Sequence, residues 1–373
     1  MRIVFLMRSV ALFGGIERIF TDKANWLASH GHEVLLLTYE QGQHQLFFPL
    51  NEKVCHEDLE CRYFTVYQKN ALVRPYCKLL IKNKFRKRLR QKIESYRPDA
   101  MVISCSMEEF RAIAISMNQL VPIVYENHGS FIESMKVNSS RLQHLWQLWV
   151  HRCIKKCNMV VSLTEGDAAC WRKYVDNVSV IPNPLTHYNP QPVLQESTRI
   201  ICVGRLVQTK RFDRIIDAFS RIAKKYPKWS VDIFGDGELG GQLQKQIADQ
   251  HLSGRVRLNK PTSAIYDEYQ RSSFFVLTSD MESFGLVMVE AMSCGIPVVS
   301  VNCPFGPSEI IEDGVTGLLA EMTVESLSEK IEWMITHPSE RLEMGQKAHI
   351  AAARYEKDKV MREWEAAYLS VCR

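Results

Sequence analysis

The stretch at residues 282–299 reads Glu-Ser-Phe-Gly-Leu-Val-Met-Val-Glu-Ala-Met-Ser-Cys-Gly-Ile-Pro-Val-Val. It is almost entirely apolar, yet it carries one carboxylate at its start, Glu282, and a second at Glu290. An apolar run at 274–278 precedes it, and Gly295 followed by Pro297 is typical of the end of a helix. The pattern therefore predicts a strand, a helix that starts near Ser283 and a second strand, which is the repeating unit of a parallel sheet.

The same alternation of short apolar runs and amphipathic segments extends over most of the 373 residues. It is interrupted by prolines at positions 182, 184, 190 and 192, which are typical of a linker between domains. The predicted fold class is therefore α/β, with two Rossmann-like parallel-sheet domains in tandem. Ligands of such sheets bind beyond the carboxyl ends of the strands, so we expect the site in a cleft between the domains.

Composition excludes several classes of protein. The 46% hydrophobic and 24% charged residues allow a core in each domain and do not indicate disorder. The eleven cysteines include no C-x-x-C pair, so the sequence predicts neither a zinc site nor a disulfide framework, and a reducing cytoplasm fits. No window has the ~20 apolar residues of a membrane span, and the N-terminus is interpreted as a buried first strand rather than a signal peptide.

The net charge of +5 is distributed unevenly, because the segment 74–93 is almost purely basic. Its apolar residues Ile81, Phe85, Leu89 and Ile93 fall at every fourth position, along one face of a helix. A basic amphipathic helix around 78–93 predicts binding to an anionic membrane surface. The alternative is a solvated helix that covers a sheet. Nucleic acid is not expected as a partner, since no nucleic-acid motif accompanies the basic residues.

The two glutamates predict a ligand site. Eight residues along a helix rise about 12 Å with roughly 80° of rotation, so Glu282 and Glu290 could border one elongated polar ligand such as a nucleoside diphosphate sugar. The free amides of Ser283, Phe284 and Gly285 at the helix N-terminus would meet oxygens that carry negative charge. The alternative is that each glutamate makes a surface ion pair.

Two further elements indicate phosphate binding. Arg205 and Lys210 lie between a buried strand and a helix, where a guanidinium fork and an ammonium suit a diphosphate, although solvated loop cations are the alternative. Gly14 and Gly15 follow the first strand, and such a turn lets backbone amides approach a phosphate or sugar. The full G-x-G-x-x-G fingerprint is missing, which disfavours a nicotinamide site.

These elements, in this order, resemble the retaining glycosyltransferases of the GT-B fold, specifically glycosyltransferase family four. The match is strongest from Arg199 to Leu319 and includes the ending Asp-Gly-Val-Thr-Gly-Leu-Leu at 313–319. The resemblance implies that Glu290 binds the ribose hydroxyls, that Glu282 lies against the donor sugar, and that Arg205 and Lys210 stabilise the departing diphosphate. The implied donor-binding set is Gly14, Gly15, Arg205, Lys210, Glu282, Ser283, Phe284, Gly285, Leu286 and Glu290.

The resemblance also implies how the reaction is catalysed. No D-x-D sequence occurs, so a metal-bridged diphosphate is disfavoured, and we expect no cofactor and no metal. The implied catalytic residues are Glu282, Lys210, Arg205 and His128. Family members usually carry a His near the donor sugar, and His128 follows a strand in Tyr-Glu-Asn-His-Gly-Ser. The alternative is that His128 is satisfied by the loop backbone.

The family resemblance extends to domains and partners. It implies an N-terminal acceptor-side domain at 1–184, a nucleotide-sugar-binding domain at 185–355, and a terminal helix at 356–373 that packs back on the first domain. The loop at 300–311 looks like that of bacterial enzymes that build capsule, O-antigen of lipopolysaccharide, or exopolysaccharide on a polyprenyl-diphosphate carrier. A hexosyltransferase that uses a UDP-sugar, or a GDP-sugar, is therefore expected in the cytoplasm, peripheral on the inner face of the membrane.

Two alternative functions stay open. The same fold can catalyse nucleotide-sugar epimerisation, which needs no acceptor. A third possibility is a non-catalytic protein of this fold that binds glycan or a partner transferase.

Overall fold

The computed structural model describes residues 1–11, 14–106, 109–110, 113–114, 117, 120–135, 152–188 and 197–372. It divides into two compact units, one of Met1–Pro182 with Met361–Arg373 and one of Asn183–Val360. The sequence predicts that the first domain ends at residue 184, in the linker, and that the terminal helix begins at residue 356. Pro190 and Pro192 of the expected linker lie outside the described residues.

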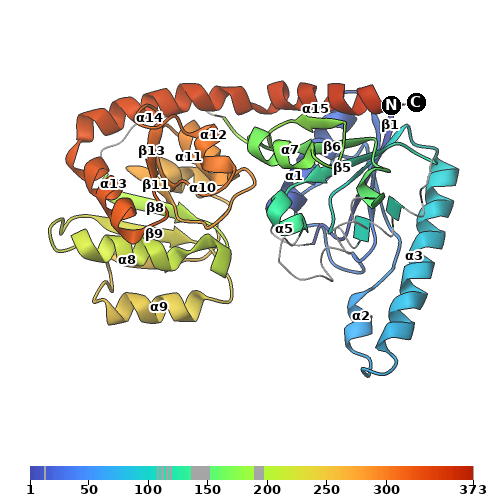
Figure 1. The fold of residues 1–373 in the computed structure, drawn as a ribbon, viewed down its shortest axis with the longest axis horizontal. Coiled ribbons are helices and arrows are strands. Elements are labelled where there is room, and N and C mark those ends of the chain that lie inside the picture. Colours follow the sequence, from blue (N-terminus) through green and yellow to red (C-terminus); the bar gives the residue numbers. More distant parts are fainter. Residues whose placement is uncertain are drawn as a thin grey trace. The chain divides into compact units, whose positions relative to one another are not determined.

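The first unit contains a parallel sheet, which has seven strands within the described residues, in the order β3-β2-β1-β4-β5-β6-β7 (Figure 1). The strands are β1 (Arg2–Met7), β2 (Glu33–Thr38), β3 (Val54–Asp58), β4 (Ala100–Ile103), β5 (Ile123–Asn127), β6 (Met159–Ser162) and β7 (Val178–Val180). The described helices of this unit are α1 (Gly15–Ser29), α2 (Phe64–Tyr67), α3 (Arg74–Tyr96), α5 (Phe131–Met135), α7 (Glu165–Trp171) and most of α15 (Lys357–Val371).

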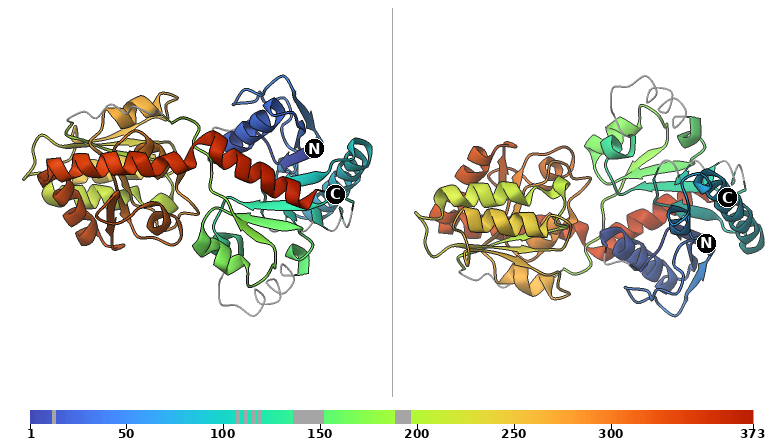
Figure 2. Two further views of the ribbon diagram at one scale, coloured as in Figure 1. Left: turned by 90° about the horizontal axis from the view of Figure 1, so that it is seen from above. Right: turned by 90° about the horizontal axis from the view of Figure 1, so that it is seen from below.

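Helices cover both faces of this sheet, which explains why β1 is a continuous apolar run rather than an alternating one. Val4 and Leu6 belong to the core cluster that α3 closes on one face. Phe5 points to the other face, where its ring meets Phe20 of α1 at 5.5 Å and Tyr368 of α15 at 6.0 Å. The terminal helix therefore packs on the first sheet from Met361 onward (Figure 2).

The second unit contains another parallel sheet, with the order β10-β9-β8-β11-β12-β13 among the described strands. The strands are β8 (Arg199–Val203), β9 (Ser230–Phe234), β10 (Val256–Asn259), β11 (Phe274–Leu277), β12 (Val298–Val301) and β13 (Gly317–Ala320). The helices are η1 (Gln208–Lys210), α8 (Phe212–Ile222), α9 (Gly240–Asp249), α10 (Ile265–Gln270), α11 (Leu286–Ser293), α12 (Gly306–Ile310), α13 (Val324–Thr336), α14 (Pro338–Ala352) and η2 (Ala353–Tyr355). The predicted fold class, two Rossmann-like parallel-sheet domains, is confirmed.

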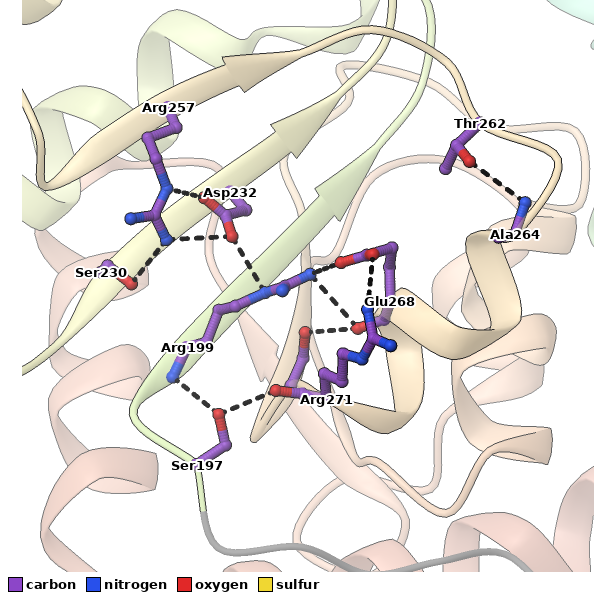
Figure 3. A network of polar contacts seen from close by, with 10 residues as sticks. Ser197, Arg199, Ser230, Asp232, Arg257, Thr262, Ala264, Glu268 and Arg271 are labelled. Atoms are coloured by element: carbon purple, nitrogen blue, oxygen red, sulfur yellow. Dashed lines mark hydrogen bonds and ion pairs between the residues drawn. The ribbon is translucent and has the colours of Figure 1, made fainter.

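A polar network ties three strands of the second sheet to α10 (Figure 3). The buried carboxylate of Asp232 in β9 pairs with Arg199 Nε of β8 at 2.9 Å and with Arg257 Nε of β10 at 2.5 Å. Arg199 also pairs with Glu268 of α10. Because Arg199 begins β8, the network braces the strand at its start and leaves the segment after its carboxyl end for a ligand.

The apolar stripe that the sequence predicts on the basic helix α3 faces the protein core and not a lipid surface. Phe85, Leu89 and Ile93 are buried in the core of the first unit, and Ile81 packs against it. That stripe is therefore not available to lipid, and the alternative of a helix covering a sheet describes this face correctly. Among the described residues, no helix has both the length and the hydropathy that a membrane crossing requires.

Candidate functional site

Helix α11 begins at Leu286, so the prediction of a start near Ser283 is wrong by three residues. The backbone of Glu282 is bound elsewhere: its N–H donates to Pro304 O at 3.4 Å, and its carbonyl accepts from Gly306 N at 3.2 Å. These bonds hold residue 282 against the loop before α12 and keep it out of the helix. Glu282 and Glu290 are thus not on one helix, and the expected rise of about 12 Å along a helix between them does not apply.

Gly285 forms the junction between this turn and α11. Its φ of +87° lies in the left-handed region, and a Cβ there would come within 2.5 Å of Met288 Cε. Only glycine adopts this conformation without strain. The exposed amides of the helix N-terminus therefore start at Leu286, while Ser283 and Phe284 lie in the turn that precedes it.

Lys210 and Glu282, which the sequence predicts to share a site, are in direct contact. Lys210 Nζ lies 2.6 Å from Glu282 Oε1, and Ser279 Oγ donates to the same oxygen at 2.6 Å. The Glu282 side chain is only 8% exposed, so its charge needs these partners. The ion pair leaves Lys210 partly exposed and able to meet a second anion.

The position of Lys210 is fixed by the loop that follows the neighbouring strand β11. Thr278 Oγ1 donates to Lys210 O at 2.8 Å, and Asp280 N donates to Thr209 O at 2.9 Å. Arg214 of α8 donates to Thr278 O at 2.7 Å and pairs with Asp280 at 2.8 Å. Sequence reasoning missed this brace, although Arg214, four residues after Lys210, was a signal for it.

Arg205 lies in the same segment between β8 and η1, with its side chain exposed. Within the part of the chain that the structure describes, its guanidinium makes no hydrogen bond or ion pair. An exposed guanidinium of this kind is suited to a phosphate group, because Arg binds two oxygens at once.

Glu290 of α11 is buried and held by an aromatic residue that the sequence did not single out. Tyr269 of α10 donates its hydroxyl to Glu290 Oε2 at 3.2 Å. Burial, followed by the nearby Glu290 carboxylate, raises the pKa of Tyr269 well above its ordinary value. The phenol therefore stays protonated and holds Glu290 Oε2 in place by its hydrogen bond.

Gly14 and Gly15 stand where the sequence predicts, at the start of α1 and after β1. Gly14 is the N-cap in extended conformation, and α1 begins at Gly15. A Cβ at Gly15 would meet no atom within 4 Å, whereas a Cβ at Gly14 would come within 2.0 Å of Glu17 Oε2, so the Glu17 carboxylate covers the N-cap on one side. An anion at the first amides of α1 would require the Glu17 side chain to move aside.

His128 follows β5, and its side chain is 2% exposed. Its Nε2 lies 2.8 Å from Glu126 Oε2, which also receives Lys23 Nζ of α1 at 2.9 Å. Tyr368 of α15 donates to Glu126 Oε1 at 2.5 Å, and Lys23 lies over the ring of Trp364 at 2.9 Å. His128 therefore contacts the Glu126 side chain of a buried network, whereas the alternative predicts contacts with the loop backbone.

The charges in this network set the form of the histidine. Despite burial, Lys23 and the hydrogen bonds to the carboxylate lower the pKa of Glu126 to about 2. Burial lowers the pKa of His128, and burial also lowers the pKa of Lys23 to about 8. Since an ionised carboxylate only accepts, neutral His128 must donate from Nε2, and its Nδ1 is then the acceptor.

Metal ligands are not clustered in the described residues, since no group of three His, Cys, Asp or Glu side chains there could hold an ion. The fit of the site to a charged ligand rests on Arg205, Lys210 and the helix amides.

Comparison with known proteins covers both halves of the chain. The family model described as Glycosyltransferase Family 4 matches residues 13–187, and that of Glycosyl transferases group 1 matches residues 188–350. An uncharacterised glycosyltransferase of Haemophilus influenzae is 28% identical over 98% of this chain and 99% of its own length. The amylovoran biosynthesis glycosyltransferase AmsD of Erwinia amylovora is 24% identical over 97% of this chain and 98% of its own.

Among solved structures, S. aureus TarM is similar with a TM-score of 0.79 and 16% sequence identity. The match covers 98% of this chain and 99% of that chain, which was crystallised as a mutant with fondaparinux, alpha-GlcNAc-glycerol and UDP. At this identity the likeness shows the fold, and it confirms the expected GT-B architecture.

Proposed function

The chain belongs to the GT-B glycosyltransferases of the family 4 type, and from that premise we propose that it transfers a hexose from a nucleotide sugar with retention. The observation that carries the proposal is the contact between Lys210 and Glu282, in the segment after β8 that also holds the exposed Arg205. In this proposal the donor is UDP-linked, which is supported by the UDP in the TarM crystals. No metal or cofactor is required, because the two cations neutralise the diphosphate.

The contacts described above support the following roles for these residues. Arg205 and Lys210 bind the diphosphate, and charge that develops on the leaving oxygen strengthens both interactions in the transition state. The Glu282 carboxylate accepts a hydrogen bond from a sugar hydroxyl, and its interaction with Lys210 weakens when the donor binds. The Glu290 carboxylate, which Tyr269 holds in place, accepts from the ribose hydroxyls. The anomeric C–O bond to the diphosphate breaks, the acceptor oxygen bonds to the same face, and its proton passes to the diphosphate.

Neutral His128 completes the proposed catalytic set. With Nε2 donating to Glu126, the ring can offer Nδ1 as an acceptor but carries no positive charge. Gly14, Gly15, Ser283, Phe284, Gly285 and Leu286 complete the proposed donor-binding set, because the amides at the start of α1 and of α11 suit phosphate and sugar oxygens.

The acceptor in our proposal is a polyprenyl-diphosphate-linked glycan of a bacterial surface polysaccharide. The relative named for amylovoran biosynthesis and the TarM complex with a glycosylated glycerol support a surface-polymer acceptor. A lipid carrier places the enzyme at the inner face of the cell membrane, peripheral to it and in the cytoplasm. The cationic α3 supports this location, because anionic lipid attracts basic segments.

A thermal-shift experiment tests the donor. The full chain is heated with UDP, GDP, ADP or NAD, each in large excess and in the presence of a chelator. At 100-fold excess over the dissociation constant, a native-state ligand adds about 2.7 kcal/mol of stability. We expect UDP to raise Tm without metal. A response to GDP alone would change the donor nucleotide, and a response to NAD alone would contradict the proposed site.

Substitution of Glu290 tests its binding role. We expect Glu290→Ala to raise the donor KM by about 10- to 100-fold, because hydrogen bonds to a charged group contribute roughly 1.5–3 kcal/mol. The change in kcat should be small, since ribose contacts are the same in ground and transition states. Steady-state kinetics with varied donor measures both. Glu329→Ala, which removes an exposed glutamate of α13, is the matched control, and unchanged donor kinetics for Glu290→Ala would reject this role.

A further inference from the structure

Exposed apolar side chains gather at one place in the first unit. Of the fourteen large hydrophobic residues exposed among the described positions, six lie between residues 64 and 80. They are Phe64, Leu72, Val73, Tyr76, Leu79 and Leu80, and we call them the apolar tip. Leu72 is 88% exposed and Tyr76 is 65% exposed, so these side chains are not partly covered core residues. Exposed apolar residues that are this close together in the chain indicate a binding surface.

The apolar tip lies on a projection. Figure 1 shows α2 and the first turns of α3 extending beyond the sheet of their own unit, with the connecting loop at the end. Within α3, Tyr76, Leu79 and Leu80 are spaced to share one face of the helix. At roughly 100° per residue, this face is nearly opposite the side on which Ile81 and Phe85 pack on the core. Tyr76, Leu79 and Leu80 of the tip therefore face away from the sheet that α3 covers.

Positive charge surrounds the apolar tip. Between Cys61 and Ile93 the sequence contains eleven Lys and Arg residues and no Asp or Glu. Further along α3, the helical face that carries Tyr76, Leu79 and Leu80 continues with Lys87 and Arg90. This face is therefore apolar near the N-terminus of the helix and cationic in its later turns. This order matches the depth profile of a lipid surface, where acyl chains lie beneath anionic headgroups.

From this arrangement we infer that the apolar tip inserts into an anionic lipid bilayer while the cations of α3 contact the headgroups. The inference rests on the proposed function, because a lipid-linked acceptor requires the enzyme at a membrane. A second copy of the chain is a poor occupant, since two surfaces of high positive charge repel. Nucleic acid would suit the cations but would leave the Leu side chains without apolar partners.

Vesicle flotation of the full chain tests the inference. Wild-type protein should float with vesicles of phosphatidylcholine and phosphatidylglycerol, bind far less to pure phosphatidylcholine, and lose part of its binding in high salt. The triple variant Leu72→Ser, Leu79→Ser and Leu80→Ser keeps every charge and should bind at least about tenfold more weakly. The control variant Leu342→Ser with Ile350→Ser removes two exposed apolar residues of α14 and should float like wild type.

A spectroscopic variant separates insertion from simple attraction. Leu80→Trp should show a blue-shifted emission on anionic vesicles and quenching by brominated acyl chains, because the indole would reach the apolar layer. Absence of wild-type binding to anionic vesicles, or equal binding of the triple variant, would overturn the inference. So would displacement of the protein from vesicles by RNA with no effect of the triple substitution.

The same samples distinguish this inference from the proposed function. The triple variant should keep the rise in Tm caused by UDP, since the tip is not part of the donor site. Vesicle binding without any nucleotide response would reject the transferase and keep the lipid surface. A UDP response without vesicle binding would do the reverse.

Discussion

Lys210→Ala is expected to lower kcat by about 10²- to 10³-fold, which is the usual loss when one preorganised donor to a developing oxyanion is removed. Lys210 Nζ is held by Glu282 at 2.6 Å and its backbone is fixed by Thr278, so the ammonium is in place before the donor arrives. Its interaction strengthens as charge develops on the departing diphosphate, and the loss should therefore appear in kcat more than in the donor KM.

Two further variants make this expectation specific. Lys224→Ala removes an equally charged but exposed residue of the same unit and should leave kcat unchanged. Lys210→Arg keeps the charge and should restore part of the activity, because charge is needed more than shape at a leaving group. Since Lys210→Ala also leaves Glu282 without its cation, Tm of each variant is measured beside the initial rates. A kcat within threefold of wild type for Lys210→Ala would remove it from the catalytic set.

Residues that share a short loop with a strand could be placed from the sequence. Lys210 follows β8 and Glu282 follows β11, and these strands are neighbours in the sheet, so the rule on carboxyl ends brings the two side chains together. The start of α11 could not be placed in this way. It depends on bonds from Glu282 to Pro304 and Gly306, more than twenty residues away, and helix start signals do not include such contacts.

Periodicity also has a limit that α3 illustrates. The spacing of Phe85, Leu89 and Ile93 correctly predicts one apolar face, but the same spacing suits a lipid surface and a protein core. Only the fold shows that β1 and its neighbours occupy this face. Leu79 and Leu80 fall outside the predicted stripe, and it is their exposure in the fold that shows that they do not reach the core.

The buried network of the first unit lies furthest from what a sequence can show. Lys23 and Glu126 are 103 positions apart, and Tyr368 is 242 positions from Glu126. The one signal was a lysine inside the apolar part of α1 and a glutamate inside β5, both of which are rarely buried unless paired. The pairing of Lys23 with Glu126 depends on the strand order of the first sheet, and the contact of Tyr368 with Glu126 depends on α15 packing on that sheet.

Glu126→Gln is expected to lower the free energy of unfolding by about 3–5 kcal/mol, because the fully buried Lys23 loses its carboxylate and must then either stay charged without a partner or give up its proton. The contact with Tyr368 would also be weakened, and through it the attachment of α15 to the first unit. Urea unfolding of the full chain, followed by Trp fluorescence, measures the change. The exposed pair Lys92 and Glu57 is the matched control, since Glu57→Gln should cost no more than about 1 kcal/mol.

A double variant and the pH dependence decide whether the buried charge is the cause. Lys23→Met with Glu126→Gln removes both charges and should be more stable than Glu126→Gln alone, as expected when an unpaired ion is the main cost. The pKa of Glu126 is about 2 in the fold and 4.5 ordinarily, so its stabilising contribution is complete above about pH 4.5 and is lost as the pH falls toward 2. Glu126→Gln should flatten the loss of stability over that window. If the double variant were as unstable as the single one, the cost would lie in packing around His128 and Tyr368 rather than in the charge of Lys23.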